Sequence, residues 1–472
     1  MNNIPCYPKK FISPKIILYN NKLADFLGIN LDENNYDLLS QIFSGQKLFF
    51  SEQPYALAYA GHQFGFFVPQ LGDGRAHLMG SVQASDGQFY EIQLKGSGPT
   101  PFSRGGDGLS PLGPALREYI ISESLFHLNV PTTRSLAVVT TGEKVHREQE
   151  YLGGIVTRVA LSHIRIGSFE YYTNINDLSS LKELVNLTIE KHYPELNIKN
   201  SVLELFKSVG FKISKLISKW MSIGFIHGVM NTDNMALSGQ TIDFGPCAFM
   251  DEFSHSKVFS SIDKNGRYSY ENQPSIALWN LSRFAETLIP LMDTTETEAI
   301  SKLTEALEQI AIQFEKDWLD QMSLKLGIEN IEHNNKDLIL NFLNMLEKNQ
   351  LDFTNSFIAL FSESYPESPF SIEDICENKE FQEFKNQWDC YLKQKNISSA
   401  DAFKIAKKVN PLVIPRNHFV EIAIEKAYKN DYSYLEKLVS IIQNPFELKK
   451  DAYSWTAPPK SSEKVTKTFC GT

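Results

Sequence analysis

The stretch HGVMNTDNMALSGQTIDFGP, residues 227–246, determines how the rest of the chain is interpreted. It opens with His227, carries Asn234 seven residues later, and then contains Asp243-Phe244-Gly245. The side chains of Asn234 and Asp243 offer hard oxygen donors, which suit Mg²⁺ or Mn²⁺. A turn residue and a strand-end cap are the structural alternatives at these positions. We interpret both residues as metal ligands.

The order of these residues is that of a protein-kinase catalytic loop, which reads H-R-D-L-x-x-x-N and is followed by D-F-G. In that loop the Asp is the catalytic base, and here Val229 occupies its position. Valine cannot accept a proton, so the stretch predicts a kinase-like metal site without the kinase base. Asp233 is the only acidic residue near the vacant position, and it could bind an acceptor hydroxyl or support the metal site.

Patterns on either side of this stretch predict a strand-rich part followed by a helical part. Two β-type runs, 75–84 and 88–95, flank Ser85-Asp86-Gly87, which is a hairpin signal. A second, tight hairpin is expected at 235–244, with Asp243 at its end. The other strand-like runs lie at 135–141 and 154–160. Helical periodicity is expected at 111–128, 202–223, 274–291, 295–325, 337–348, 378–395, 400–408 and 418–428.

This order predicts an α+β fold of the bilobal protein-kinase type, with a nucleotide bound between the lobes. The strand-rich half forms the N-lobe, and the C-lobe is helical with a helical C-terminal extension. We expect four parts: an N-terminal extension (1–54), an N-lobe with nucleotide-binding elements (55–170), a mainly helical C-lobe with the metal site (171–450), and a tail that contains Cys470 (451–472).

Candidate phosphate-binding residues precede the metal site along the chain. Lys95 ends a predicted strand, and Glu118 lies on the helix that follows. A strand lysine paired with a helix glutamate positions the α- and β-phosphates in kinases. Alone, a lysine at a strand end is usually solvated, but the succession of lysine, glutamate, His-x₆-Asn and D-F-G favours the functional interpretation.

Two further groups of residues have the chemistry to bind phosphate, although each also has a simpler structural explanation. Gly72 and Gly74 allow a close backbone approach, but a Gly-x-Gly pair alone is more often a turn. Arg158 and Arg165 can bind phosphate with two parallel hydrogen bonds, whereas surface ion pairing is the common alternative.

Composition narrows the class of protein. The 472 residues are 42% hydrophobic and 22% charged, as in ordinary globular enzymes. A net charge of −10 argues against nucleic-acid binding as the main task. The five cysteines contain no C-x-x-C pair, so we expect a reducing compartment and no structural zinc site.

Targeting signals are not evident in the sequence. The N-terminus resembles neither a signal peptide nor a transit peptide, and no run approaches the roughly 18 apolar residues needed to cross a membrane. We therefore expect a cytoplasmic monomer without membrane or nucleic-acid partners. His62 and His163 stand at no metal-ligand spacing and are expected to be core or hydrogen-bonded residues, and FGFFVPQ (64–70) is expected to pack in the core.

Longer motifs resemble one family. They are YAGHQFGFFVPQLGDGRA, KGSGPTPFSRGGDG, LREYIISESLFHLNVPTTRSLAVV, VTRVALSHIRIGSFE, HGVMNTDNM, IDFGP, RNHFVEIAI and the terminal Cys470-Gly471-Thr472. Together they resemble the selenoprotein O (SelO, bacterial YdiU) family of protein adenylyltransferases, which have a pseudokinase fold. The resemblance spans nearly the whole chain.

The resemblance implies ATP bound in the reverse of its kinase orientation, with AMP transferred to Ser, Thr or Tyr hydroxyls of proteins. UMP transfer from UTP is also ascribed to bacterial members, and self-modification is expected. A base at position 229 would act in γ-phosphate transfer. An enzyme that transfers AMP does not need a base there, so Val229 is compatible with its activity. The residues implied are nucleotide contacts (Gly72, Gly74, Arg75), phosphate contacts (Lys95, Asp107, Gly108), cations for the inverted phosphate tail (Arg158, Arg165), the base (Asp233) and metal ligands (Asn234, Asp243).

Departures from the family pattern leave some points open. Leu109-Ser110 follows GGDG, where the family often has Arg-Ala. In some relatives the terminal residue forms a redox disulfide with a cysteine beyond D-F-G, and Cys247 is the nearby cysteine here. An inactive pseudokinase scaffold, or a kinase that uses Asp233 as its base, are the rival interpretations.

Overall fold

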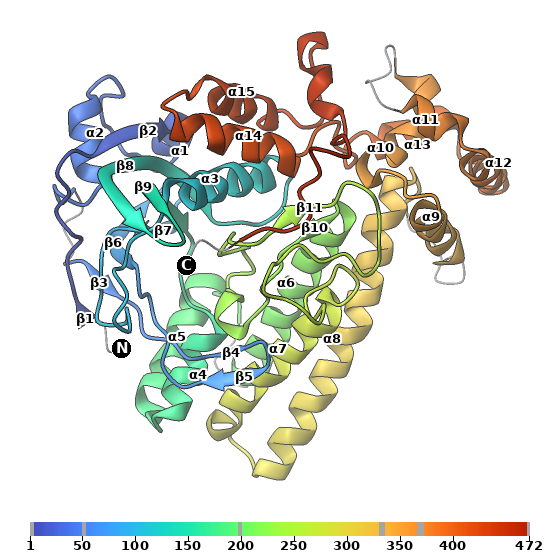
Figure 1. The fold of residues 1–472 in the computed structure, drawn as a ribbon. Coiled ribbons are helices and arrows are strands. Elements are labelled where there is room, and N and C mark those ends of the chain that lie inside the picture. Colours follow the sequence, from blue (N-terminus) through green and yellow to red (C-terminus); the bar gives the residue numbers. More distant parts are fainter. Residues whose placement is uncertain (1–3, 50–52, 197–200, 330–335, 366–371, 470–472) are drawn as a thin grey trace.

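A computed structural model describes residues 4–49, 53–196, 201–329, 336–365 and 372–469 of the chain. A seven-stranded antiparallel sheet dominates the N-terminal part, and helices dominate the rest (Figure 1). The predicted α+β fold, with a strand-rich part before a helical part, is confirmed. Within the described residues, no helix is both long and apolar enough to cross a bilayer.

The sheet has the strand order β1-β3-β6-β7-β9-β8-β2. Its strands are β1 (Ile4–Pro5), β2 (Lys15–Tyr19), β3 (Tyr55–Ala56), β6 (Ala76–Gln83), β7 (Phe89–Lys95), β8 (Arg134–His146) and β9 (Glu150–Ala160). The hairpin predicted around Asp86-Gly87 is confirmed as the β6–β7 pair. The strand-like runs at 135–141 and 154–160 lie inside β8 and β9, which pair with each other.

Alternating residues of β8 explain why both faces of the sheet are covered. Val138 packs toward helix α3 (Leu112–His127), whereas Val139 packs toward helices α1 (Asn21–Phe26) and α2 (Tyr36–Phe43). Successive side chains of a strand point to opposite faces, so each face of β8 needs its own apolar cover.

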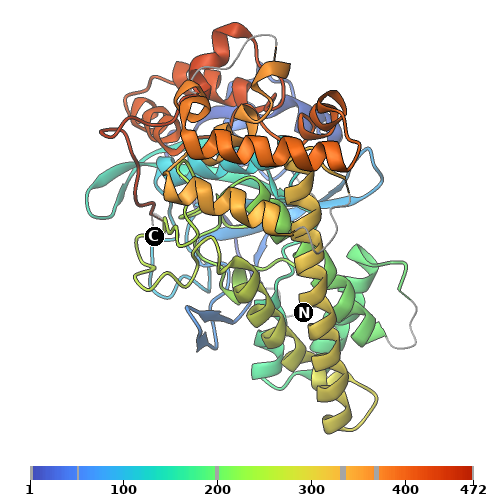
Figure 2. The ribbon, with the colours of Figure 1, turned by 90° about the vertical axis from the view of Figure 1, so that its right-hand side faces the viewer.

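Two C-terminal helices complete the cover over α3. Helices α14 (Asn417–Tyr428) and α15 (Ser433–Ile442) share an apolar cluster with α3, and the backbone N–H of Gly113 donates to the Tyr428 hydroxyl at 2.9 Å. In both views the red C-terminal helices lie at the sheet end of the molecule (Figures 1 and 2). Helices α14 and α15 thus stabilise the strand-rich half.

The helical half is built around α6 (Ser201–Ser222), which packs between α7 (Gln273–Leu288) and the long α8 (Glu296–Lys325). Gly210 allows the close approach of α6 to α8, since a Cβ there would lie 2.2 Å from an Ile310 side-chain carbon. The other helices of this half are α4 (Ile166–Asn174), α5 (Leu178–His192), α9 (Lys336–Lys348), α10 (Phe353–Ala359), α11 (Glu373–Glu377), α12 (Lys379–Gln394) and α13 (Ser399–Ala406).

One predicted hairpin is wrong. A turn does lie at 236–239, but the two arms do not pair with each other. Ala236 forms a bridge with Arg165, and Thr241 forms a bridge with Thr132. The backbone groups on both arms therefore bind the segment before β8 and the segment after β9, which fixes the Asp243 loop against the strand-rich half.

The predicted core packing of FGFFVPQ is also wrong for two of its phenylalanines. This segment forms strand β5 (Phe66–Val68), which pairs with β4 (Gly61–Gln63) in a separate two-stranded sheet. The exposed fractions of Phe66 and Phe67 are 80% and 41%. The ribbon binds residues 231–233 through His62, Gln63 and Phe64, whereas the neighbouring strand β5 keeps Phe66 and Phe67 exposed.

Candidate active site

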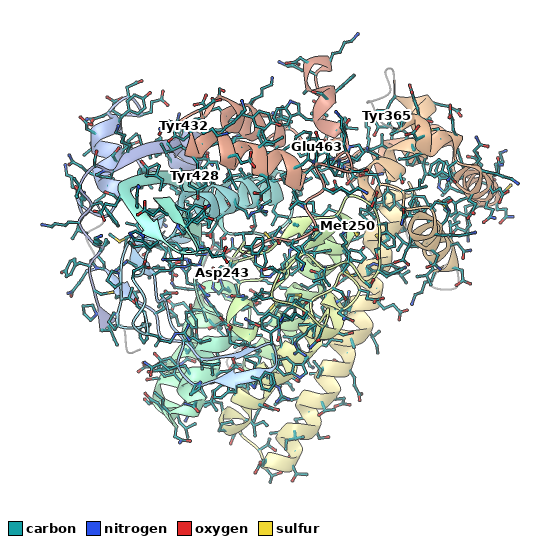
Figure 3. All side chains as sticks on the ribbon, in the orientation of Figure 1. Asp243, Met250, Tyr365, Tyr428, Tyr432 and Glu463 are labelled. Atoms are coloured by element: carbon teal, nitrogen blue, oxygen red, sulfur yellow. The ribbon has the colours of Figure 1, made fainter. Side chains whose placement is uncertain are left out.

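A cavity of about 500 Å³ lies between the sheet and the segment that contains Asp243. Figure 3 labels Asp243 at this junction, beneath α3. Every predicted site residue lines this cavity, although the motifs that supply them lie far apart in the chain. These residues are Gly72, Gly74, Arg75, Lys95, Asp107, Gly108, Glu118, Arg158, Arg165, Asp233, Asn234 and Asp243.

Three cations meet on the carboxylate of Asp243. Its Oδ1 accepts from Lys95 Nζ at 2.9 Å and from Arg158 Nη2 at 2.6 Å, and its Oδ2 accepts from Arg165 Nη1 at 2.8 Å. Burial alone would raise the pKa of Asp243, but Arg158, Lys95 and Arg165 hold it well below its usual range. Asp243 is therefore charged, at the centre of a positive cluster.

The predicted pair of Lys95 and Glu118 is present. Lys95 Nζ donates to Glu118 Oε2 at 2.8 Å, and Arg158 Nε donates to Glu118 Oε1 at 2.8 Å. Lys95 lies opposite Val156 in the β7–β9 ladder, and Arg158 follows two residues later. Residues two apart share a face of a strand, so Lys95 and Arg158 both point toward α3, which carries Glu118.

Arg165 connects the two walls of the cavity. It stands immediately before α4, and its Nη1 also donates to the backbone oxygen of Asp233 at 2.9 Å. Its Nη2 lies 3.8 Å from Asp73 Oδ1, and its guanidinium lies 4.7 Å from the Tyr59 ring centroid. Asp73 and Tyr59 were not predicted, although Asp73 stands inside the Gly-Asp-Gly motif that was singled out.

The glycine motifs are required by close packing of two loops at one end of the cavity. Gly72 has a φ of +81°, and a Cβ there would lie 2.4 Å from the Phe102 ring. Gly108 has a φ of +67°, and a Cβ there would lie 2.2 Å from Gly98 backbone atoms. Neither position can carry a side chain, because the Phe102 ring and the Gly98 backbone occupy the space that a Cβ would take.

Asp107 is held by an arginine that was not predicted. Arg147 donates from Nη1 to Asp107 Oδ2 at 2.8 Å and from Nη2 to Asp107 Oδ1 at 3.0 Å. Arg147 Nη2 also donates to the backbone oxygen of Leu109 at 2.9 Å. The hairpin end of β8 and β9 therefore fixes the loop on which the family pattern is altered at Leu109-Ser110.

The opposite wall carries Asp233 on a short 3₁₀ turn, Thr232–Asn234. Its side chain is buried, and its Oδ1 accepts from Gln63 Nε2 at 2.7 Å. Burial raises the pKa of Asp233 to about 7 despite the nearby Arg165 charge. A carboxyl with a pKa near neutrality is suited to accept a proton from a substrate hydroxyl. Gln63 is a further residue that was not predicted.

The residues proposed as metal ligands are compatible with Mg²⁺ or Mn²⁺. Asn234 Nδ2 donates to the Val229 backbone oxygen at 2.9 Å, which commits the amide nitrogen and leaves the amide oxygen for a ligand. Asp243 supplies a charged carboxylate on the same cavity. Among the described residues there is no cluster of three or more His, Cys, Asp or Glu that could hold a metal ion. An ion at Asn234 and Asp243 would thus need further oxygen ligands from substrate or water.

The cysteine that follows Asp243-Phe244-Gly245-Pro246 is buried. Cys247 Sγ lies 3.3 Å from the backbone oxygen of Phe244, to which it donates. The residue that could form a disulfide with it, Cys470, lies outside the described residues. The chain leading to it contacts the loop, since Thr468 Oγ1 donates to the Pro246 oxygen at 2.5 Å.

Comparisons with known proteins agree with this geometry. Residues 5–443 match the sequence profile of the family described as protein adenylyltransferase SelO. A protein nucleotidyltransferase YdiU from Bacillus mycoides is 45% identical over 467 residues, covering 98% of this chain and 94% of the relative. Proteins of the same name from Nitrosococcus oceani (45% over 468 residues) and Pelagibacter ubique (46% over 461 residues) each cover 94% of their own length and 99% and 98% of this chain.

The match covers both walls of the cavity and the loops at its end. The chain is a protein nucleotidyltransferase, and its substrates are a nucleotide and a protein. It belongs to the SelO family of protein adenylyltransferases.

Proposed function

We propose that this enzyme transfers AMP from ATP to Ser, Thr or Tyr hydroxyls of proteins, including its own. The observation that carries the proposal is the cluster of Lys95, Arg158 and Arg165 around Asp243 at the cavity, opposite the buried carboxyl of Asp233. A triphosphate supplies the negative charge that such a cluster attracts.

Binding of the nucleotide exchanges the partners of these cations. In the structure all three cations bind the Asp243 carboxylate. Phosphate oxygens would compete with this carboxylate for the same cations, and Asp243 and Asn234 would then hold a divalent ion. Such an ion would neutralise phosphate charge. Mg²⁺ and Mn²⁺ are the ions whose ligand preference fits an amide and a carboxylate oxygen.

Asp233 acts as the base in the transfer step. The acceptor hydroxyl gives its proton to the Asp233 carboxylate, and the hydroxyl oxygen forms a bond with the α-phosphorus. The bond between the α-phosphorus and the oxygen that bridges to the β-phosphorus breaks, and pyrophosphate leaves. Arg165 donates to the backbone oxygen of Asp233, so one of the proposed phosphate-binding cations is fixed to the turn that carries the base.

The position of the radiolabel in ATP tests the proposal. With a divalent metal, label from α-labelled ATP should appear on protein, and label from γ-labelled ATP should not. Intact-protein mass then identifies the added group as AMP. Incorporation of γ-label alone would overturn the proposal in favour of a kinase that uses Asp233. Neither label, with tight nucleotide binding and several metals tried, would favour an inactive scaffold. The same assay with α-labelled UTP decides whether UMP is a second donor group.

A further inference from the structure

The small β4–β5 ribbon binds the catalytic turn through consecutive residues. Each residue of the turn's start accepts a hydrogen bond from a residue of the ribbon. In order, these bonds run from Phe64 N to Asn231 Oδ1 (3.1 Å), from His62 N to Thr232 Oγ1 (2.7 Å) and from Gln63 Nε2 to Asp233 Oδ1 (2.7 Å). The first two involve backbone donors and fix the ribbon itself, whereas the third comes from a side chain and reaches the base.

Two glycines lie against the Asp233 side chain, Gly61 at the carboxyl group and Gly167 at the Cβ. A Cβ on Gly61 would lie 2.7 Å from Asp233 Oδ1, and a Cβ on Gly167 would lie 3.2 Å from Asp233 Cβ. The side chain therefore occupies a slot that two backbones define. The slot restricts where the carboxyl group lies, but rotation about the bond to the carboxyl carbon is a soft torsion. Gln63 donates to one of the two oxygens and so selects one rotation.

We propose that Gln63 is a positioning residue for the base. By donating to Oδ1 it presents Oδ2 to the acceptor hydroxyl in a fixed orientation. This inference rests on the proposed function, in which Asp233 accepts the hydroxyl proton. Misplacement of a reacting group by about 1 Å costs on the order of 100-fold in rate, so one hydrogen bond to the base can govern turnover.

The ribbon stays in place without the Gln63 amide. Thr232 Oγ1 donates to Glu170 Oε2 at 2.6 Å, and His62 Nδ1 lies within hydrogen-bonding distance (2.5 Å) of Glu170 Oε1. These contacts join the ribbon, the turn and α4 independently of Gln63. Substitution of Gln63 should therefore leave the fold and the phosphate-binding cations unchanged.

Two variants of similar size separate positioning from simple packing. Gln63→Met removes the donor, and Gln63→Glu replaces it with a carboxylate that repels Asp233. We expect kcat for α-label transfer to fall about 10- to 100-fold in Gln63→Met and further in Gln63→Glu. The Kd and KM for ATP should stay within about twofold, with an unchanged melting temperature. Gln88→Ala, an exposed glutamine on the far β6–β7 turn, is the control and should match the wild type.

Three results would overturn the proposal: wild-type kcat in Gln63→Met, a Gln63→Glu variant at least as active as Gln63→Met, or equal losses in kcat and ATP affinity. Gly61→Ala provides a second variant should the Gln63 variants unfold, because its methyl group would displace the same Asp233 oxygen. It should lower kcat with ATP affinity retained, and normal turnover would again count against the inference. Absence of α-label transfer by the wild type would refute the proposed function itself, which is a different outcome.

Discussion

Two clusters of buried charge lie near the segment 243–251, and they differ in what surrounds them. The first, around Asp243, opens on the cavity of about 500 Å³. The second is built on Arg416, which donates to Asp251 at 2.5 Å and to Asp352 at 2.7 Å and 3.1 Å. In this second cluster Asp251 lines a small cavity of about 40 Å³.

The difference indicates which cluster binds a ligand. In the second cluster one arginine binds two carboxylates, Asp251 and Asp352. In the first, Lys95, Arg158 and Arg165 meet on Asp243, and all three cations line the large cavity, where a polyanion can approach them. Burial of charge is thus common to both clusters, whereas several cations on the wall of a large cavity mark the ligand site.

Removing the shared carboxylate should have the largest effect. We expect Asp243→Asn to lower α-label transfer on the order of 10³-fold, since it removes a metal ligand while keeping the side-chain shape. Affinity for ATP without metal should not fall, because the carboxylate no longer competes with phosphate for the cations. Transfer rates and nucleotide titration measure the two effects. Full activity in the folded variant would exclude the metal site proposed at Asp243.

Removing the cation of the closed cluster should affect stability instead. Arg416→Met leaves the buried Asp352 and the partly buried Asp251 without this partner, which costs about 3–5 kcal/mol of unfolding free energy. Transfer per folded molecule should be unchanged. Lys464→Met, which removes an exposed ion pair with Glu252, is the control and should cost less than about 1 kcal/mol. Denaturant unfolding measures the unfolding free energy of both variants. Similar losses of unfolding free energy in the two would contradict the comparison of the two charge clusters.

A smaller effect is expected when charge is kept and geometry is lost. Arg165→Lys retains a cation but loses the planar guanidinium, whose Nη1 binds Asp243 and the Asp233 backbone oxygen while its Nη2 faces Asp73. We expect kcat/KM to fall about 10- to 100-fold, as for loss of a hydrogen bond to a charged group. Steady-state kinetics with α-labelled ATP measures this change. A variant with wild-type kcat/KM would show that charge alone matters at this position.

The sequence predicted Asn234 and Asp243 from local spacing, and Arg75, Asp107 and Gly108 from the resemblance to the family. Asn234 and Asp243 lie in one short stretch, and all the predicted site residues line one cavity. Gln63 and Asp233, by contrast, are separated by 170 positions and meet only in the folded chain. Asp73, Tyr59 and Arg147 likewise act through distant partners. Such contacts produce no periodicity or spacing in the sequence from which they could be predicted.

The same distinction between local patterns and distant contacts applies to the fold. The β6–β7 hairpin and α8 carry strong local patterns and were predicted. Strand β1 has two residues, too few for any alternation, and β2 has five, so the edges of the sheet were missed. The 235–244 hairpin was predicted from a good turn sequence, but its arms found better partners at Thr132 and Arg165. Tertiary pairing thus overrode a local signal.

The smallest effect is expected at the vacant base position itself. Val229 lines the cavity beside Asn234, whose amide donates to the Val229 backbone oxygen, so a substituted side chain here would face the nucleotide. Val229→Asp restores the carboxylate of a kinase loop, yet we expect γ-label transfer to stay at background. The orientation of the triphosphate depends on Lys95, Arg158 and Arg165, and this change moves none of them. Val229→Thr, of equal size but uncharged, is the control for altered packing. The Asp variant could instead transfer γ-label while the Thr variant does not. The base at position 229, and not the cations around Asp243, would then determine which phosphorus is transferred. The contrast between the two charge clusters would no longer explain the reaction.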